Sequence, residues 1–222
     1  MMPARNCIKE YSGSTYYHVY NRGVAKQDIF LDNQDYKIFL SYLKIYLTPV
    51  DLQRLSSQVK SLAPSKKLKN YFQEIKLHAY CLMPNHFHLF VFQEESDSMT
   101  DFMRSLGTKY SKYFNKKYKR EGPVFQSRYK AVLVQNENQF IYLSKYIHRN
   151  PLDILPTGTV LADYKYSSYQ NYLGRFYQAW VDKTEILSYF SKLNPEESYQ
   201  RFVEEIDERD LLVIKRQLLD FE

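Results

Sequence analysis

Two β-type segments joined by a tight turn constrain the fold of this chain more than any other feature. Residues 74–82 alternate between apolar and polar side chains, which predicts a strand. The turn sequence Met83-Pro-Asn85 follows, and after it comes a second β-type segment, HFHLFVF, at 86–92. This second segment is apolar on both faces beyond its two histidines, so we expect it in the centre of a sheet. Together the segments predict an antiparallel hairpin within a larger sheet.

Helical and β-type segments alternate along the rest of the chain. We expect strands at 15–21 and 129–134, and helices at 33–47, 98–119 and 138–150 from the spacing of their apolar residues. This order predicts an α+β fold, with a ferredoxin-like antiparallel sheet that carries helices on one face. Four local details are also expected: Asp32 or Asn33 as the first N-cap, Ser98 as the second, a helix stop at Glu121-Gly122-Pro123, and a positive φ at Gly23.

The composition limits which classes of protein this chain can belong to. The 222 residues, of which 44% are hydrophobic and 25% charged, can form a core without disulfides and are not disordered as a whole. Apolar runs such as Leu89–Phe92 are far shorter than the roughly 20 residues of a membrane helix, and residues 1–17 lack a signal-peptide pattern. Cys7 and Cys81 form neither a disulfide framework nor a zinc knuckle. We expect a cytoplasmic protein, nucleoid-associated if bacterial, that does not bind membranes.

The charge is concentrated in the middle of the chain. Residues 99–130 hold nine Lys/Arg and two acidic residues, a net +7 that exceeds the +6 of the whole chain, whereas residues 181–222 carry −5. Tyrosines and phenylalanines are interleaved with these basic residues, which suits a polyanion with stackable bases. The alternative is a solvated helix face whose aromatic side chains point into the core. The candidate DNA contacts are Arg22, Arg104, Lys109, Lys112, Lys116, Lys117, Lys119, Arg120, Arg128 and Lys130.

Two short patterns have the spacing needed for chemistry. Side chains two residues apart on a strand share a face, so His86 and His88 project together and make half a site for a divalent metal ion. The alternative is two polar positions on a half-buried face. Tyr146 and Asn150 are four residues apart and share a face of their predicted helix. The alternative there is an ordinary helix end before Pro151.

Four motifs occur together in one order. They are YHVYNRG at 17–23, MPNHFHL at 83–89, GPVFQSRY at 122–129 and YIHRNP at 146–151. The combination closely resembles the single-tyrosine transposases of the His-hydrophobic-His (HUH) endonuclease superfamily. Within that superfamily it is most similar to the REP-associated tyrosine transposases.

The resemblance divides the chain into two parts. It implies a catalytic domain at 12–175 with an insertion at 50–73, which we expect to be partly helical over 52–62. An acidic helical extension at 176–222 lies outside it, with helices expected near 182–192 and 196–219.

The same resemblance implies an activity and a site. Its members cut single-stranded DNA next to a hairpin and rejoin it through a 5′-phosphotyrosine. Tyr146 matches the nucleophile, while His86, His88 and Asn150 match the ligands of Mg²⁺ or Mn²⁺. Lys145, just before the tyrosine, has no assignable role, and the acidic C-terminus departs from what DNA binding favours. Two alternatives stay open, a non-catalytic hairpin-binding protein and a metal-dependent phosphodiesterase that uses water, as does a homodimer.

Overall fold

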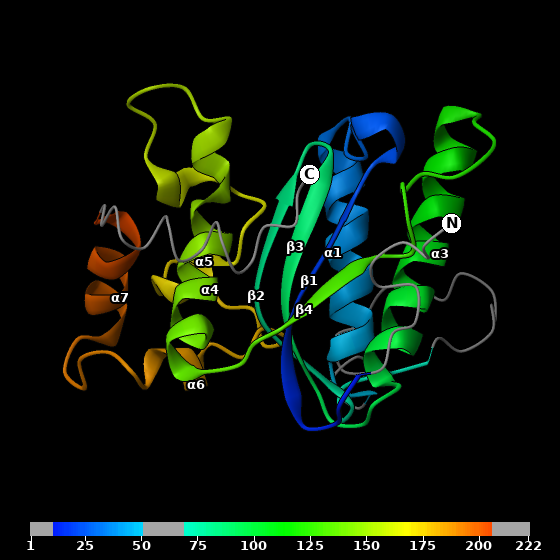
Figure 1. Cartoon of the computed structure of the whole chain (residues 1–222). Coiled ribbons are helices and arrows are strands. Elements are labelled where there is room, and N and C mark those ends of the chain that lie inside the picture. Colours follow the sequence, from blue (N-terminus) through cyan, green and yellow to red (C-terminus); the bar gives the residue numbers. More distant parts are fainter. Residues whose placement is uncertain (1–10, 51–68, 206–222) are drawn as a thin grey trace, which may run out of the picture.

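The computed structural model describes residues 11–50 and 69–205, and a four-stranded sheet lies at its centre (Figure 1). The sheet has the strand order β2-β3-β1-β4, and each neighbouring pair is antiparallel. The hairpin of β2 and β3 is confirmed, and β3 lies inside the sheet as its apolar pattern predicts. The strands are β1 Thr15–Arg22, β2 Ile75–Met83, β3 His86–Gln93 and β4 Lys130–Leu133.

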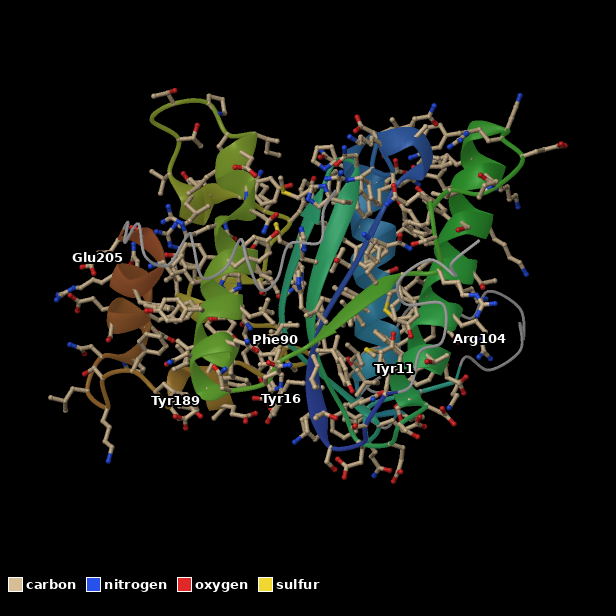
Figure 2. The ribbon with its side chains drawn as sticks, viewed as in Figure 1. Tyr11, Tyr16, Phe90, Arg104, Tyr189 and Glu205 are labelled. Carbon is tan, nitrogen blue, oxygen red and sulfur yellow. The ribbon has the colours of Figure 1, made fainter. Side chains whose placement is uncertain are left out.

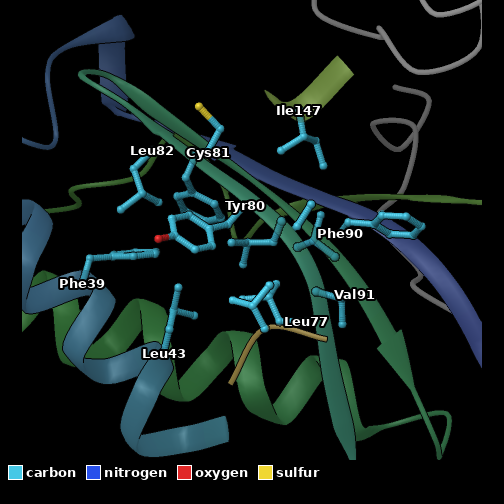
Figure 3. Close-up of a cluster of buried hydrophobic side chains, with 14 of the residues drawn as sticks. Phe39, Leu43, Leu77, Tyr80, Cys81, Leu82, Phe90, Val91 and Ile147 are labelled. Atoms are coloured by element: carbon cyan, nitrogen blue, oxygen red, sulfur yellow. The ribbon is translucent and has the colours of Figure 1, made fainter. Parts of the chain in front are cut away.

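Two helices cover one face of the sheet. Helix α1 (Asn33–Leu47) connects β1 to β2, and helix α3 (Ser98–Tyr118) connects β3 to β4. The Phe39 ring of α1 packs against Phe87 of β3 at 5.2 Å and against Tyr110 of α3 at 5.1 Å between ring centroids. Figure 3 shows Phe39 and Leu43 reaching the sheet from the α1 side. This connection order and the shared face confirm the α+β, ferredoxin-like prediction.

A further helical layer covers the opposite face, so the expectation of helices on one face only was wrong. Helix α4 (Glu137–Arg149) packs there, with Phe140 against Tyr16 at 4.9 Å and against Phe90 at 5.1 Å between ring centroids. Ile147 of α4 approaches the sheet from this second side in Figure 3. Behind α4 lie α5 (Tyr169–Tyr172), α6 (Thr184–Leu187) and α7 (Pro195–Glu204) (Figure 1). The short 3₁₀ helices are η1 Val24–Lys26, η2 Asn150–Asp153 and η3 Leu161–Asp163.

The ends of α3 differ from the prediction. Asp97, not Ser98, occupies the N-cap position, and its side chain makes no capping hydrogen bond. At the other end Lys119 adopts a left-handed conformation with φ 49°, and the Arg120 amide donates to the Asn115 carbonyl at 2.9 Å. The helix therefore ends ahead of Gly122, because a left-handed residue with a back-bonded amide already satisfies its last carbonyls. Asp32 caps α1, with a reciprocal capping box, as one of the two predicted alternatives.

Gly23 does not have the predicted positive φ. Its φ is −62°, and the positive φ values of this turn lie at Ala25 and Lys26. The glycine is required for a different reason, because a Cβ at this position would lie 2.0 Å from the Gln27 carbonyl oxygen. Close approach of the backbone, not a left-handed conformation, explains the residue.

The C-terminal helices are shorter than expected. Helix α6 covers only part of the range 182–192, and α7 ends at Glu204 because Glu205 has an extended backbone. Residues 206–219 of the predicted last helix lie outside the described residues, as does the helix expected at 52–62. Tyr199 of α7 is buried, and its hydroxyl lies 2.7 Å from Nδ1 of His148 in α4. The extension thus completes the second helical layer. Within 11–50 and 69–205 no helix is long and apolar enough to cross a membrane.

Candidate active site

The structure brings the four predicted site residues together between β3 and α4. His86 and His88 project from β3 toward α4, with ring centroids 5.0 Å apart, and the Tyr146 ring centroid lies 5.4 Å from that of His88. Asn150 lies next to these side chains and influences the pKa values of both imidazoles and of the Tyr146 phenol. The expected shared face of Tyr146 and Asn150 is therefore present. One amide connects the tyrosine with the histidine pair.

The orientation of His86 is fixed by the turn before β3. Its Nδ1 lies 2.6 Å from Oδ1 of Asn85, whose Nδ2 donates to the Lys26 carbonyl at 3.2 Å. Because Asn85 presents its oxygen to the ring, the proton of the neutral imidazole belongs on Nδ1. The lone pair is then on Nε2, the nitrogen that a metal ion would use.

His88 is oriented by a residue that the sequence analysis did not select. Nδ1 of His88 lies 2.8 Å from Nε2 of His18, which is placed diagonally across the ladder of β1 and β3 on the same face. When His88 donates its Nδ1 proton to His18, its own lone pair is on Nε2, as in His86. His18 belongs to the first sequence motif, which was the only available signal for it.

Both site histidines are neutral at pH 7. Burial lowers the pKa of His86 to about 4, with the nearby Arg22 charge also lowering it and the hydrogen bond to Asn150 opposing the shift. Burial likewise holds the pKa of His88 well below its usual range, assisted by His18 and His86. Neutral imidazole is the form that binds metal ions, so these shifts keep the pair ready for a ligand role over a wide pH range.

The donor set fits a hard divalent ion. Asn150 donates through Nδ2 to the Tyr146 carbonyl at 2.9 Å, which directs its Oδ1 toward the imidazoles. Among the described residues no group of three or more His, Cys, Asp or Glu could hold a metal ion, so a site here depends on the amide oxygen. Two imidazole nitrogens and one amide oxygen suit Mn²⁺, and the oxygen shifts the preference toward Mg²⁺ and Mn²⁺.

Tyr146 differs from the other tyrosines that compete for the nucleophile role. Burial raises the pKa of its phenol, and the hydrogen bond with Asn150 opposes that shift, so the hydroxyl carries its proton at pH 7. Tyr110 is fully buried and donates to the Ile29 carbonyl. Tyr113 donates to Asp35, while Tyr142 packs on Phe202 at 5.4 Å between ring centroids. Tyr146 alone among these four contacts the histidine pair.

The predicted DNA-contacting residues lie elsewhere and fall into two groups. Lys117 is engaged within the fold, because its amine lies 2.7 Å from Asp32 and 2.8 Å from the buried Asp35. Arg104 extends outward from α3 at the edge of the molecule (Figure 2). The exposed members of the set are Arg104, Lys112, Lys116, Lys119 and Arg128, and the partly buried ones are Arg22, Lys109, Lys117, Arg120 and Lys130.

Comparison with known proteins connects this site to transposases. Residues 52–150 match the model of the family described as "Transposase IS200 like". No curated protein matches the sequence. Five solved chains match, among them the "Structure of the REP associates tyrosine transposase bound to a REP hairpin". That structure is 16% identical, has a TM-score of 0.49, and is aligned over 83% of this chain and 94% of its own.

The family match confirms the predicted resemblance to this class of transposases. The match covers 99 of the 222 residues. The matched range contains His86, His88, Tyr146 and Asn150, whereas His18 and the rest of β1 precede it. It begins at residue 52 and so includes most of the stretch that we expected to be an insertion.

Proposed function

We propose that this protein cleaves and rejoins single-stranded DNA at hairpin-bearing sites through a 5′-phosphotyrosine intermediate, as a transposase of the REP-associated tyrosine type. One observation carries the proposal: the His88 ring centroid lies 5.0 Å from that of His86 and 5.4 Å from that of Tyr146, and Asn150 donates to the Tyr146 carbonyl at 2.9 Å. A nucleophile candidate and a three-donor metal site thereby meet at one amide. Residues 12–175 would form the catalytic domain and 176–222 its helical extension.

Tyr146 acts as the nucleophile in this proposal. Its phenol oxygen attacks the scissile phosphorus and loses its proton, the bond to the leaving 3′-oxygen breaks, and that oxygen takes up a proton. The 5′-phosphate is then esterified to the tyrosine. A phenolate is a far better leaving group than an alkoxide because the phenol pKa is about 10. The linkage therefore preserves the bond for religation by a 3′-hydroxyl.

His86, His88 and Asn150 would hold a divalent ion. Bound Mg²⁺ or Mn²⁺ supplies Lewis-acid stabilisation of the charge on the scissile phosphate. Asn85 and His18 hold the two imidazoles by their Nδ1 atoms, so both Nε2 lone pairs are oriented before any ion arrives. Asn150 is additionally held by the Tyr146 carbonyl, which ties the ligand to the helix that bears the nucleophile.

A covalent protein–DNA species tests the proposal directly. The protein is incubated with hairpin-bearing single-stranded DNA and Mn²⁺ and then analysed on a denaturing gel. The wild-type protein should form a covalent adduct and Tyr146→Phe should form none, although its folding, Mn²⁺ uptake and DNA binding remain intact. Tyr142→Phe, one turn earlier on the same helix, is the matched control and should keep the adduct.

The two alternatives predict other results on the same gel. A phosphodiesterase that uses water would cut the DNA without an adduct, and Tyr146→Phe would still cut it. A non-catalytic hairpin-binding protein would retard the DNA on a native gel without cutting it. An adduct that persists in Tyr146→Phe would mean that another tyrosine is the nucleophile.

A further inference from the structure

A groove lies between α3 and the segment 123–129, on the sheet face opposite to α4. Its volume is about 900 Å³, within the range of roughly 300–1,000 Å³ typical of small-molecule sites. Three basic side chains line it, Arg104, Lys112 and Arg128, together with the rings of Phe125 and Tyr129. No Asp or Glu of the described residues belongs to the lining. The groove therefore combines positive charge with aromatic surface.

Gly107, in the middle of α3, forms part of this lining. A glycine inside a helix is unfavourable relative to alanine, so its presence calls for a reason. Packing does not supply one, because a Cβ at this position would meet nothing within 4 Å. The backbone does not supply one either, since Gly107 is not among the glycines with positive φ. What the missing side chain does is keep the groove open.

We propose that this groove binds an unpaired stretch of the DNA strand, with one base over Gly107 against Phe125. Arg104, Lys112 and Arg128 would neutralise the neighbouring phosphates. Aromatic stacking together with backbone neutralisation is how proteins hold single-stranded nucleic acid. An acidic peptide would use the charges but would not need the ring or the open space over the glycine.

The groove is connected to the candidate active site by backbone hydrogen bonds. The Gln126 amide donates to the Arg22 carbonyl at 2.9 Å, and the Val24 amide donates to the Val124 carbonyl at 3.0 Å. Arg22 is paired with His86 in the ladder of β1 and β3. One wall of the groove is thus fixed to the strand end beside the site. A strand seated in the groove would position the cleavage point, which makes this inference dependent on the proposed function.

Gly107→Leu tests the inference by filling the groove without removing a charge. Leucine is a good helix former and its Cβ has room, so the variant should fold like the wild type. The probes are fluorescein-labelled oligo(dT), a DNA hairpin with a single-stranded thymidine tail, and the same hairpin without a tail. Gly107→Leu should weaken binding of the first two by about tenfold, the loss of one stacked base, and leave the tailless hairpin unchanged. Gly107→Ala adds only one methyl group, so it should weaken binding of the same two probes by less than Gly107→Leu.

Two further variants test the groove without depending on how the leucine of Gly107→Leu packs. Arg104→Gln and Lys112→Gln alter exposed side chains, and each should lower the log–log salt slope for oligo(dT) by about 0.7. A 5-iododeoxyuridine placed in the tail should photocrosslink within 123–129.

The outcomes separate this inference from the proposed function. If the wild type binds none of the three probes, the proposed function fails. If it binds the tailed hairpin and Gly107→Leu binds it equally well, the groove is not the site. Equal weakening of the tailless hairpin would show that the groove holds duplex DNA, which also overturns the proposal.

Discussion

The two faces of the sheet carry opposite kinds of polar groups. On the α4 face the histidines of the candidate site are buried and neutral, because burial lowers the pKa values of His18, His86 and His88. On the α3 side the basic groups of the groove, such as Arg104 and Lys112, are exposed, and the buried charge is Asp35, which is paired with Lys117. Buried neutral donors suit metal ligation and covalent chemistry, whereas exposed cations suit phosphate binding. Catalysis and DNA binding should therefore be separable by mutation.

The largest expected effect is on the α4 face. His86→Ala or His88→Ala should abolish Mn²⁺ binding and the covalent adduct, because each removes one of three donors. DNA affinity should fall little, since Lys/Arg–phosphate contacts dominate it. Isothermal calorimetry with Mn²⁺ and fluorescence anisotropy with hairpin DNA measure the two effects. Asn150→Ala should lose less than either histidine variant because water can replace one oxygen donor. Full Mn²⁺ affinity in the double histidine variant would remove β3 from the site.

A smaller effect on Mn²⁺ affinity is expected from substitution of His18, which lies behind His88. His18→Phe removes the partner of His88 Nδ1 and keeps the size of a buried side chain. Loss of such an outer-shell hydrogen bond lowers metal affinity by about 10- to 100-fold. Calorimetry with Mn²⁺ should show this loss, while hairpin binding stays at the wild-type level. Unchanged Mn²⁺ affinity would mean that packing alone orients His88.

Local sequence patterns predicted many of the elements and site contacts described above. The features that they missed depend on contacts between residues far apart in the sequence. The bounds of α1 follow from apolar spacing and a cap, and the meeting of Tyr146 with Asn150 follows from helical geometry. The role of His18 depends on a partner 70 residues away, and the engagement of Lys117 depends on Asp32, 85 residues away. No local pattern reports such pairs.

The incorrect predictions for Gly23 and Ser98 also show that local sequence alone does not determine these details. A glycine after a strand is compatible with a positive φ and with a close backbone contact, and only the position of Gln27 decides between them. Ser98 and Asp97 are both residue types that favour N-caps, so the sequence leaves the helix start uncertain by one residue.

The neutrality of the α4 face should also appear in the pH dependence of stability. Burial lowers the pKa of His148 to about 3, against about 6.5 in the unfolded chain, so only the unfolded state takes up this proton between those values. Stability should therefore fall as pH drops below about 6.5, by about 1.4 kcal/mol per pH unit for this one group. Urea unfolding of wild type and His148→Gln at several pH values should give slopes that differ by one proton. Identical slopes would show that His148 is protonated in the folded protein.

The smallest expected effect tests the α3 side, where neighbouring lysines should behave differently. Lys116 is exposed, so Lys116→Gln should lower the log–log salt slope for single-stranded DNA by about 0.7 without changing the melting temperature. Lys117→Gln should leave that slope unchanged and lower the melting temperature. Burial alone would raise the pKa of Asp35, but Lys117 and the Tyr118 hydroxyl hold it below its usual range. The Lys117→Gln variant removes the cation that stabilises this buried carboxylate, so the folded protein should be less stable. Anisotropy titrations over a range of salt, paired with thermal melts, measure both quantities. A lowered slope in Lys117→Gln together with an unchanged slope in Lys116→Gln would place the DNA along the Asp32 side of α3.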